Sequence, residues 1–274
     1  MFGRIWLFAS HGLCSNPSVN LSMVESIADS YKGGTQRTRV ISETWGEENL
    51  YCPNCVSSSL TRLPHNAKAS DFKCPSCGFW YQLKGQKTKI GSRINDGAYS
   101  AMMEAIREDR TPNFYFLHYD LATWSIRNLL LIPHFAFPSS AIIKRKPLSA
   151  TARRAGWVGC IFALHRIPID ARIDVVREQV VSPAAVVREQ FRKIKPLQEL
   201  SVTERGWTLD VLNIVRRLGQ AEFSNTDVYE FERELEQLHP GNRHIRDKIR
   251  QQLQVLRDRG LLVHVDRNRW RVAP

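Results

Sequence analysis

The sequence predicts an α/β protein: a mixed core with an embedded zinc-ribbon-like knuckle, followed by a C-terminal winged-helix domain. Three observations support this prediction. Helical and strand-like segments intermingle up to about residue 195, and two CxxC pairs lie within that region. Three helical patterns and two short strands then close the chain. We therefore expect one domain over residues 23–195 and a second over residues 203–274, with a linker around Pro196.

Apolar spacing locates the elements of the first domain. Helical spacing occurs at 20–32 and 38–50, and again at 95–110 with Asn95 or Asp96 as the cap. Apolar and aromatic runs predict strands at 69–74, 78–85, 113–120, 124–133, 158–168 and 171–176.

Residues 1–22 have two interpretations. Their apolar run breaks at His11-Gly12 and no small-residue cleavage site follows, so they make a poor secretory signal. The alternative is an extension, with folding beginning near Met23.

The last 70 residues follow the order of a winged helix. Helical patterns occupy 206–219, 224–240 and 242–260, with Ser224 and Asn242 as expected N-caps and Gly219 and Gly260 as expected stops. Alternating strands at 261–266 and 269–274 form the expected wing.

The charge balance favours a polyanionic partner. Lys and Arg number 39 against 27 Asp and Glu, a formal net charge of +12. No apolar run reaches the roughly 18 residues that a membrane-spanning helix needs. A basic amphipathic helix with a broad apolar face is also missing, which argues against membrane-surface binding.

The cysteine spacing is the most specific motif. Cys52 and Cys55 form one CxxC pair, and after eighteen residues Cys74 and Cys77 form another. Two such turns supply the four thiolates of a tetrahedral, structural Zn²⁺ site. Four paired cysteines, with Cys14 and Cys160 isolated, indicate a metal site and not a disulfide framework, so we expect a cytoplasmic protein.

A second metal pattern is interleaved with the cysteines. Asp71 lies on one predicted strand, and Gln82-Leu83-Lys84 lies on the next. An acid followed by Gln/Glu-x-Lys is typical of magnesium-dependent phosphodiesterases of the PD-(D/E)xK type. Asp71, Gln82 and the Leu83 carbonyl would offer Mg²⁺ its preferred oxygen ligands, while Lys84 orients the attacking water.

Several collinear blocks add a resemblance from about Met23 to Arg271. The blocks are "YCPNC", Asp71 followed by CxxC and x-Leu-Lys, "INDGAY", "TPNFYFL", "RKPL", "TARRAGW", "RGWT" and "KIRQQLQVLRD". In these the chain resembles the DpnI family of methyl-directed type II restriction endonucleases. The resemblance implies a nuclease core with a zinc knuckle and a winged helix, both contacting methylated DNA. It also implies cleavage of double-stranded DNA at GATC sites that carry N6-methyladenine, and we expect a monomer in solution.

One departure from the family pattern leaves two functions open. The family has Glu-x-Lys where this chain has Gln82-x-Lys84, so the site loses one formal charge unless an acid such as Glu43 compensates. The chain is then either a working endonuclease or a non-cleaving methyl-DNA-binding protein with a decayed centre. Retention of both Asp71 and Lys84 favours the first.

Two segments carry the predicted DNA contacts. Ile245, Ile249, Leu253 and Leu256 form the apolar stripe of the last helix. The face away from that stripe presents candidates for base and phosphate contacts, namely Arg243, His244, Arg250, Gln251 and Gln254. In the core, Trp157 is the expected apolar plate for a methyl group, flanked by Arg153 and Arg154 for phosphates.

Overall fold

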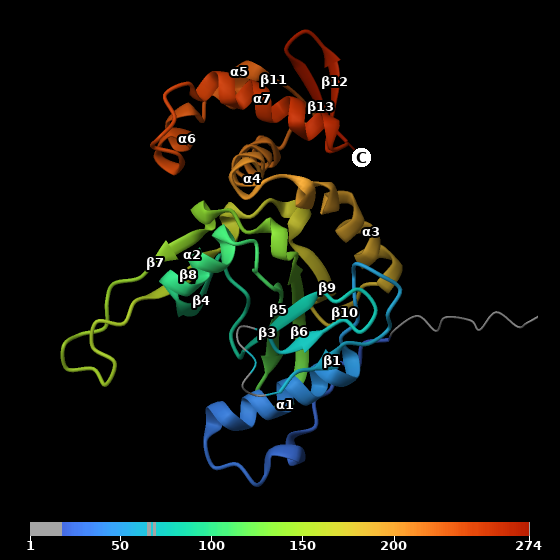
Figure 1. Ribbon diagram of the computed structural model, residues 1–274. Coiled ribbons are helices and arrows are strands. Elements are labelled where there is room, and N and C mark those ends of the chain that lie inside the picture. The colour runs from blue at the N-terminus through green and yellow to red at the C-terminus, as the bar shows by residue number, and fades with distance from the viewer. Residues whose placement is uncertain (1–17, 65–66, 68–69, 274) are drawn as a thin grey trace, which may run out of the picture.

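A computed structural model describes residues 18–64, 67 and 70–273 and confirms the predicted α/β class. Its centre is a seven-stranded sheet (Figure 1). In spatial order the strands are β1 (Thr61–Arg62), β2 (Phe72–Lys73), β3 (Trp80–Gln86), β5 (Asn113–Asp120), β6 (Ser125–Ile132), β9 (Ile173–Arg177) and β10 (Val180–Val181). Within the described chain only β3 and β5 pair in parallel, and the other neighbours are antiparallel.

A small second sheet packs on one face of the central sheet, and one helix packs against the small sheet. The small sheet has the order β4 (Arg93–Ala98), β8 (Gly159–Ala163), β7 (Ile142–Lys144), and α2 (Tyr99–Arg107) follows β4. Phe162 of β8 packs against Phe114 and Phe116 of β5, with ring centroids 5.1 and 5.8 Å apart. Aromatic side chains therefore join the two sheets.

Helix α1 (Gly34–Asn49) lies against the other face, together with the cysteine loop, residues 50–60, which carries Cys52 and Cys55. Gly46 lets α1 approach closely, because a Cβ there would lie 2.8 Å from the Phe72 ring and 3.2 Å from Leu83. The Tyr115 hydroxyl donates to the Tyr51 carbonyl at 2.8 Å and so joins β5 to the cysteine loop. Helix α3 (Ala184–Ile194) packs on β9.

Short 3-10 turns connect many of these elements. They are η1 (Glu25–Ala28), η2 (His134–Ala136), η3 (Ser139–Ala141), η4 (Leu164–Arg166), η5 (Ile169–Ala171) and η6 (Lys195–Glu199). Residues 18–22 run beside β6, where the Leu21 carbonyl accepts from Ile126 N at 2.7 Å and Ser22 bridges Ser125. The fold therefore includes residues before Met23, where the sequence predicted that folding begins, and the remainder of the expected extension, residues 1–17, lies outside the described residues.

The C-terminal part has the winged-helix order that the sequence predicts. Its elements are α4 (Val202–Arg217), β11 (Glu222–Ser224), α5 (Asn225–Tyr229), α6 (Glu232–Leu238), α7 (Ile245–Asp258), β12 (Leu262–Asp266) and β13 (Arg269–Val272). Ser224 caps α5 through a capping box with Asp227. Gly219 and Gly260 adopt positive φ just after α4 and α7, as expected of helix stops.

Four local expectations were wrong. Of the helix expected at 20–32, the structure has only the four-residue turn η1. Asn95 and Asp96 lie in β4, and α2 begins at Tyr99 without a side-chain cap. The helix expected at 224–240 breaks into α5 and α6. Helix α7 begins at Ile245, with His244 and not Asn242 at its N-cap.

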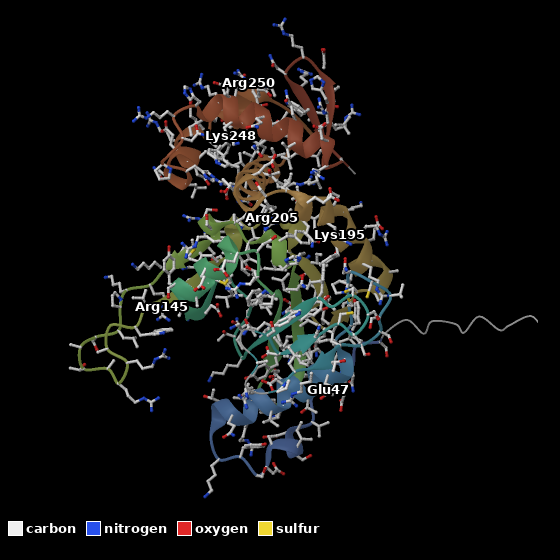
Figure 2. The ribbon with its side chains drawn as sticks, viewed as in Figure 1. Glu47, Arg145, Lys195, Arg205, Lys248 and Arg250 are labelled. Atoms are coloured by element: carbon white, nitrogen blue, oxygen red, sulfur yellow. The ribbon has the colours of Figure 1, made fainter. Side chains whose placement is uncertain are left out.

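Helix α4 joins the two parts of the molecule (Figures 1 and 2). Arg205 is 5% exposed, and its guanidinium donates to the carbonyls of Gln198 and Leu200, both at 3.2 Å, and pairs with Asp109 of the core. Asp210 accepts from Ser140 of η3 at 2.6 Å and contacts His239, the C-cap of α6, at 2.8 Å. Among the described helices, none is long and apolar enough to cross a membrane.

Candidate metal centres and nucleic-acid interface

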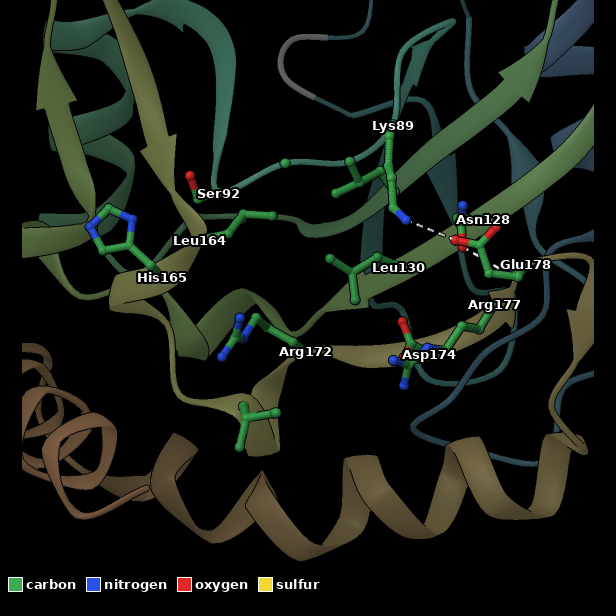
Figure 3. Close-up of a pocket in the computed structure, with 13 residues that line it drawn as sticks. Lys89, Ser92, Asn128, Leu130, Leu164, His165, Arg172, Asp174, Arg177 and Glu178 are labelled. Atoms are coloured by element: carbon green, nitrogen blue, oxygen red, sulfur yellow. Dashed lines mark hydrogen bonds and ion pairs between the residues drawn. The ribbon is translucent and has the colours of Figure 1, made fainter. Parts of the chain in front are cut away.

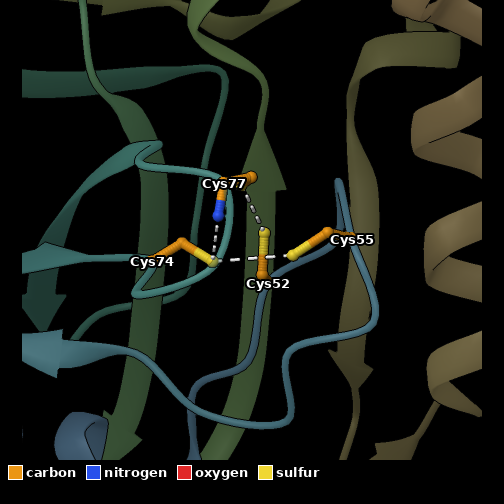
Figure 4. A group of neighbouring side chains, drawn as sticks. All are labelled: Cys52, Cys55, Cys74 and Cys77. Atoms are coloured by element: carbon orange, nitrogen blue, oxygen red, sulfur yellow. Dashed lines mark hydrogen bonds between the residues drawn. The ribbon is translucent and has the colours of Figure 1, made fainter.

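The four cysteines form one cluster, with Cys52 and Cys55 in the loop after α1 and Cys74 and Cys77 in the turn that joins β2 to β3 (Figure 4). The Sγ atoms of Cys52 and Cys77 are 3.5 Å apart, those of Cys55 and Cys74 are 3.6 Å apart, and all four lie within 4.8 Å of one another. A tetrahedral zinc ion with Zn–S bonds of about 2.3 Å places its sulfur ligands about 3.8 Å apart. The cluster therefore has the composition and spacing of a structural zinc knuckle.

Electrostatics differ among these thiols. Burial raises the pKa of Cys52 and of Cys55. At Cys74 burial is outweighed by backbone hydrogen bonds from Cys77 and Ser76, which lower the pKa to about 7. Metal binding requires thiolates, so the folding free energy of the knuckle is coupled to metal binding.

Hydrogen bonds tie the knuckle to its surroundings. The Tyr81 hydroxyl of β3 lies 3.0 Å from the Cys52 sulfur, and burial raises the pKa of Tyr81 so that the hydroxyl stays protonated. Arg188 of α3 donates to the carbonyls of Cys52 at 3.3 Å and Ser57 at 3.0 Å. Partners of this kind fix the orientation of metal ligands.

Asp71 lies beside β3, immediately before β2 begins. Its backbone N–H donates to the Tyr81 carbonyl at 2.8 Å, and its Oδ2 accepts from Leu83 N at 2.8 Å. Burial raises the pKa of Asp71 against the lowering effect of the Leu83 hydrogen bond, and the negative charge of Glu43 raises it further. The hydrogen bond thus fixes the orientation of the Asp71 carboxylate, and burial leaves its charge poorly solvated.

Gln82 and Lys84 lie on the side of β3 that faces the small sheet. They pair in register with Phe114 and Phe116 of β5, whereas Leu83 points to the opposite face and packs near Gly46. Lys84 Nζ is 6.0 Å from the centroid of the Phe114 ring. Its positive charge lowers the pKa of Asp71, so the structure brings the predicted acid and lysine into one electrostatic group.

Glu43 of α1 is near this group. Its side chain is 12% exposed and pairs with Arg62 at 2.5 Å and with Arg39 at 3.5 Å. Its charge raises the pKa of Asp71. The sequence-based suggestion that Glu43 lies near the centre is consistent with this placement.

The sequence gives no indication that Asp96 contacts Lys84. Asp96 Oδ1 lies 2.5 Å from Lys84 Nζ, and the Asp96 side chain is 8% exposed. The interpretation of residues 95 and 96 as helix caps concealed this role. Only the packing of β4 beside β3 reveals it.

Trp157 lies at the base of the loop that joins β7 to β8, drawn yellow-green on the left of Figure 1. Its ring rests on Gly159, where a Cβ would lie 2.9 Å from two ring atoms. The Arg154 guanidinium lies 4.7 Å from the ring centroid, and Arg153 and Arg154 are exposed. Trp157 is half-buried on the surface and is not part of the core.

Helix α7 has the two faces that the sequence predicts. Ile245, Ile249, Leu253 and Leu256 are buried. The predicted DNA contacts are exposed, namely Arg243, His244, Arg250, Gln251 and Gln254. Figure 2 labels Arg250 and Lys248 on this helix. Arg250 pairs with Asp247 and reaches the Tyr229 hydroxyl at 3.5 Å, and Lys248 donates to Gln251 at 2.8 Å.

A cavity of about 450 Å³ lies elsewhere on the core, between the β3–β4 connection and β9 (Figure 3). Its charged side chains largely neutralise one another: Lys89 pairs with Glu178 at 3.1 Å, and Arg177 with Asp174 at 3.6 Å. Its volume and mixed charge identify no ligand.

The described chain joins a sheet-rich α/β core with a four-cysteine cluster to a C-terminal domain of the helix-turn-helix class, and a domain of this class indicates a DNA-binding protein. The chain belongs to the DpnI, or Dam-replacing, family, whose profile it matches over residues 19–200. Residues 203–272 match the Dam-replacing HTH domain. Membership indicates a methylation-dependent function like that of restriction endonucleases, and it confirms the resemblance inferred from the sequence.

Proposed function

We propose that this protein is a type II restriction endonuclease that cleaves double-stranded DNA at GATC sites containing N6-methyladenine. Asp71, Gln82 and Lys84 form its catalytic centre in this proposal. The observation that carries it is the bond from Leu83 N to Asp71 Oδ2, which fixes the acid beside the strand that bears Gln82 and Lys84. The family matches support a nuclease core and a DNA-binding domain.

The donor set suits a hard divalent cation. Asp71 offers a carboxylate, Gln82 an amide oxygen and Leu83 a main-chain carbonyl, which are the oxygen ligands that Mg²⁺ prefers. The Tyr81 carbonyl and the Leu83 amide both bond to Asp71, so the backbone of these two residues faces the acid. When bound, Mg²⁺ would polarise the scissile phosphate and make water more acidic.

The protein groups have separate tasks in this scheme. The Leu83 amide holds one carboxylate oxygen of Asp71, and Oδ1 makes no hydrogen bond to the described residues, which leaves it available to a cation. Lys84 orients the attacking water and adds positive charge beside the phosphate. The water oxygen bonds to phosphorus as the bond to the leaving oxygen breaks, which yields an alcohol and a phosphate monoester.

Methyl recognition needs more than one contact. A methyl group in an apolar contact contributes about 0.8 kcal/mol, roughly fourfold in affinity. We assign one contact to Trp157, with Arg153 and Arg154 on phosphates, and a second to the exposed face of α7. We also propose two domains, at 23–195 with residues 18–22 packed on it and at 203–274, and binding of DNA by a single copy of the chain.

Cleavage of methylated plasmid tests the proposal. Purified protein is incubated with methylated and unmethylated GATC plasmid in Mg²⁺ or Mn²⁺, beside Lys84→Ala. We expect cleavage of the methylated plasmid alone, and none by the variant. Methyl-selective binding without cleavage in either metal would refute the nuclease proposal.

Gln82 favours one alternative, a non-cleaving reader of methylated DNA. A neutral amide binds Mg²⁺ more weakly than a carboxylate does, because ligand charge sets cation affinity. Gln82→Glu separates the two functions. A working centre needs roughly tenfold less Mg²⁺ for half-maximal cleavage after this change. A decayed centre is inactive as it stands and gains cleavage only in the variant.

A further inference from the structure

We propose that Asp96 is a positioning residue of the catalytic centre, which holds the Lys84 ammonium in place and balances its charge. This inference rests on the proposed endonuclease function and adds a residue to it. Asp96 lies on β4 and Lys84 on β3, so two elements of different sheets supply the pair.

The contact between the two side chains is close and shielded. Lys84 Nζ lies 2.5 Å from Asp96 Oδ1, and the two side chains are 28% and 8% exposed. A lysine of this length has several rotamers, and a fixed carboxylate at its tip selects among them. Partly buried ion pairs add little net stability, because desolvation offsets much of the attraction. The pair is therefore better explained by the geometry that it imposes on Lys84.

Asp96 is itself well placed. The pairing of β4 with β8 shifts register between Asp96 and Ala98, and such bulges re-aim side chains. Cys160, opposite Asp96 on β8, places its sulfur 4.0 Å from Asp96 Oδ2. Burial, with the Asp96 charge adding to it, raises the pKa of Cys160 to about 12, so the thiol keeps its proton and faces Asp96 as a donor.

Gln82 gives the pair its importance in this chain. With a neutral amide at position 82, the charged members of the centre are Asp71, Lys84 and nearby Glu43, and Glu43 is already paired with Arg62 and Arg39. An unpaired Lys84 would then repel a cation at Asp71 with little to offset it. Asp96 offsets that charge while leaving the ammonium at the centre.

A role as a metal ligand does not fit Asp96. Its Oδ1 lies 2.5 Å from the Lys84 ammonium and its Oδ2 lies 4.0 Å from the Cys160 sulfur, so both carboxylate oxygens already face side chains of the protein. Asp96 therefore acts through Lys84 and not beside Asp71.

Cleavage kinetics of the full chain test the inference. Asp96→Asn keeps the shape and removes the charge, and we expect the single-turnover cleavage rate to fall about 10- to 100-fold, as for other residues that orient catalytic groups. The affinity for methylated DNA should stay within about twofold, because Asp96 contacts no DNA in the proposal. Asp96→Glu should recover part of the rate, since it restores the carboxylate.

Glu178→Gln is the matched control, because it also removes the acidic partner of a lysine. Glu178 and Lys89 form an exposed ion pair, 3.1 Å apart, that lies outside the catalytic centre. It should cleave at the wild-type rate. An unchanged rate in a folded Asp96→Asn would overturn the inference, as would equal losses in Asp96→Asn and the control.

Acetylation of lysines, read by mass spectrometry without DNA or metal, gives a second result that does not depend on catalysis. We expect Lys84 to be acetylated several-fold faster in Asp96→Asn than in the wild type, with Lys73 unchanged. Equal Lys84 rates would show that Asp96 does not hold Lys84. A wild-type chain that cuts no DNA would instead refute the proposed function, and the Lys84 rates would still decide whether the pair exists.

Discussion

The cysteine knuckle and the Asp71–Lys84 centre share strand β3 but differ in how complete they are before metal binds. The knuckle has four sulfur ligands within 4.8 Å of one another, and hydrogen bonds from Tyr81 and Arg188 hold it in place. The acid–lysine centre has one fixed carboxylate, one neutral amide and a lysine that is paired with a second acid.

This difference indicates separate tasks for the two metals. A closed set of four thiolates has no open position and can serve only geometry. A sparse oxygen set leaves positions for water and phosphate, so its strength depends on charge balance around a few residues. We infer that the knuckle supplies rigidity to β3, and that Glu43 and Asp96 adjust the charge beside it.

Loss of zinc is the change with the largest expected effect. Structural zinc sites contribute binding free energies of about 10–16 kcal/mol in small peptides, comparable to the roughly 5–15 kcal/mol net stability of a whole domain. Cys74→Ser should therefore lose zinc, lower the melting temperature sharply and abolish cleavage. Zinc content and thermal unfolding measure this.

Cys160→Ser serves as the control, since Cys160 is also buried but lies outside the cluster. It should retain one zinc ion per chain. A Cys74→Ser melting temperature equal to that of the wild type would show that the zinc knuckle does not stabilise the fold.

Asp71→Asn should separate activity from stability. Removal of the charge should lower cleavage by roughly 100- to 1000-fold or more. Burial raises the pKa of Asp71, so the folded chain binds this proton more tightly than the unfolded chain does. The Asp71 carboxyl therefore does not destabilise the fold at low pH, where it is protonated. It lowers the free energy of unfolding as the pH rises above the usual carboxyl pKa of about 3.9. Without Mg²⁺ at pH 7, the variant should melt at or above the wild-type temperature, and the difference should shrink as the solution is acidified.

Asp174→Asn is a matched control, because burial also raises the pKa of Asp174. It should show the same pH trend in melting temperature without loss of cleavage. A clearly lower melting temperature for Asp71→Asn at pH 7 would mean that the carboxylate is structural.

Much of this arrangement follows from local sequence, and the rest depends on packing. The spacing of the cysteines, the alternation in β3 and the apolar stripe of α7 are properties of neighbouring residues, and the structure confirms the elements they predict. The position of Asp96 could not be predicted from the sequence. In "INDGAY" an acid that often caps helices precedes a helical pattern, but the residue lies on a strand with a β-bulge. Its contact with Lys84 arises only where the small sheet covers the central one. The turn η1 likewise stands where helical spacing predicted a helix. Val19, Met23 and Ala28 of this mostly irregular segment are each buried, so packing against the core and not helical spacing determines its conformation.

The smallest expected effect is the most informative about the link between the two sites. Tyr81 precedes Gln82 on β3, and its hydroxyl lies 3.0 Å from the Cys52 sulfur. Tyr81→Phe removes one hydrogen bond, which lowers stability by about 0.5–1.5 kcal/mol. Zinc should be retained, since all four sulfurs remain. If the knuckle orients the centre through β3, the cleavage rate should fall a few-fold at unchanged DNA affinity.

Tyr51→Phe tests whether that loss is specific to the link. The Tyr51 hydroxyl is buried and has no hydrogen-bond partner among the described residues, so its removal should cost no stability and leave cleavage intact. Equal cleavage rates for Tyr81→Phe and the wild type would show that the knuckle does not orient the catalytic residues, although both sites use β3. The knuckle would then stabilise the fold alone, and the precision of the catalytic centre would have to come from Leu83, Glu43 and Asp96.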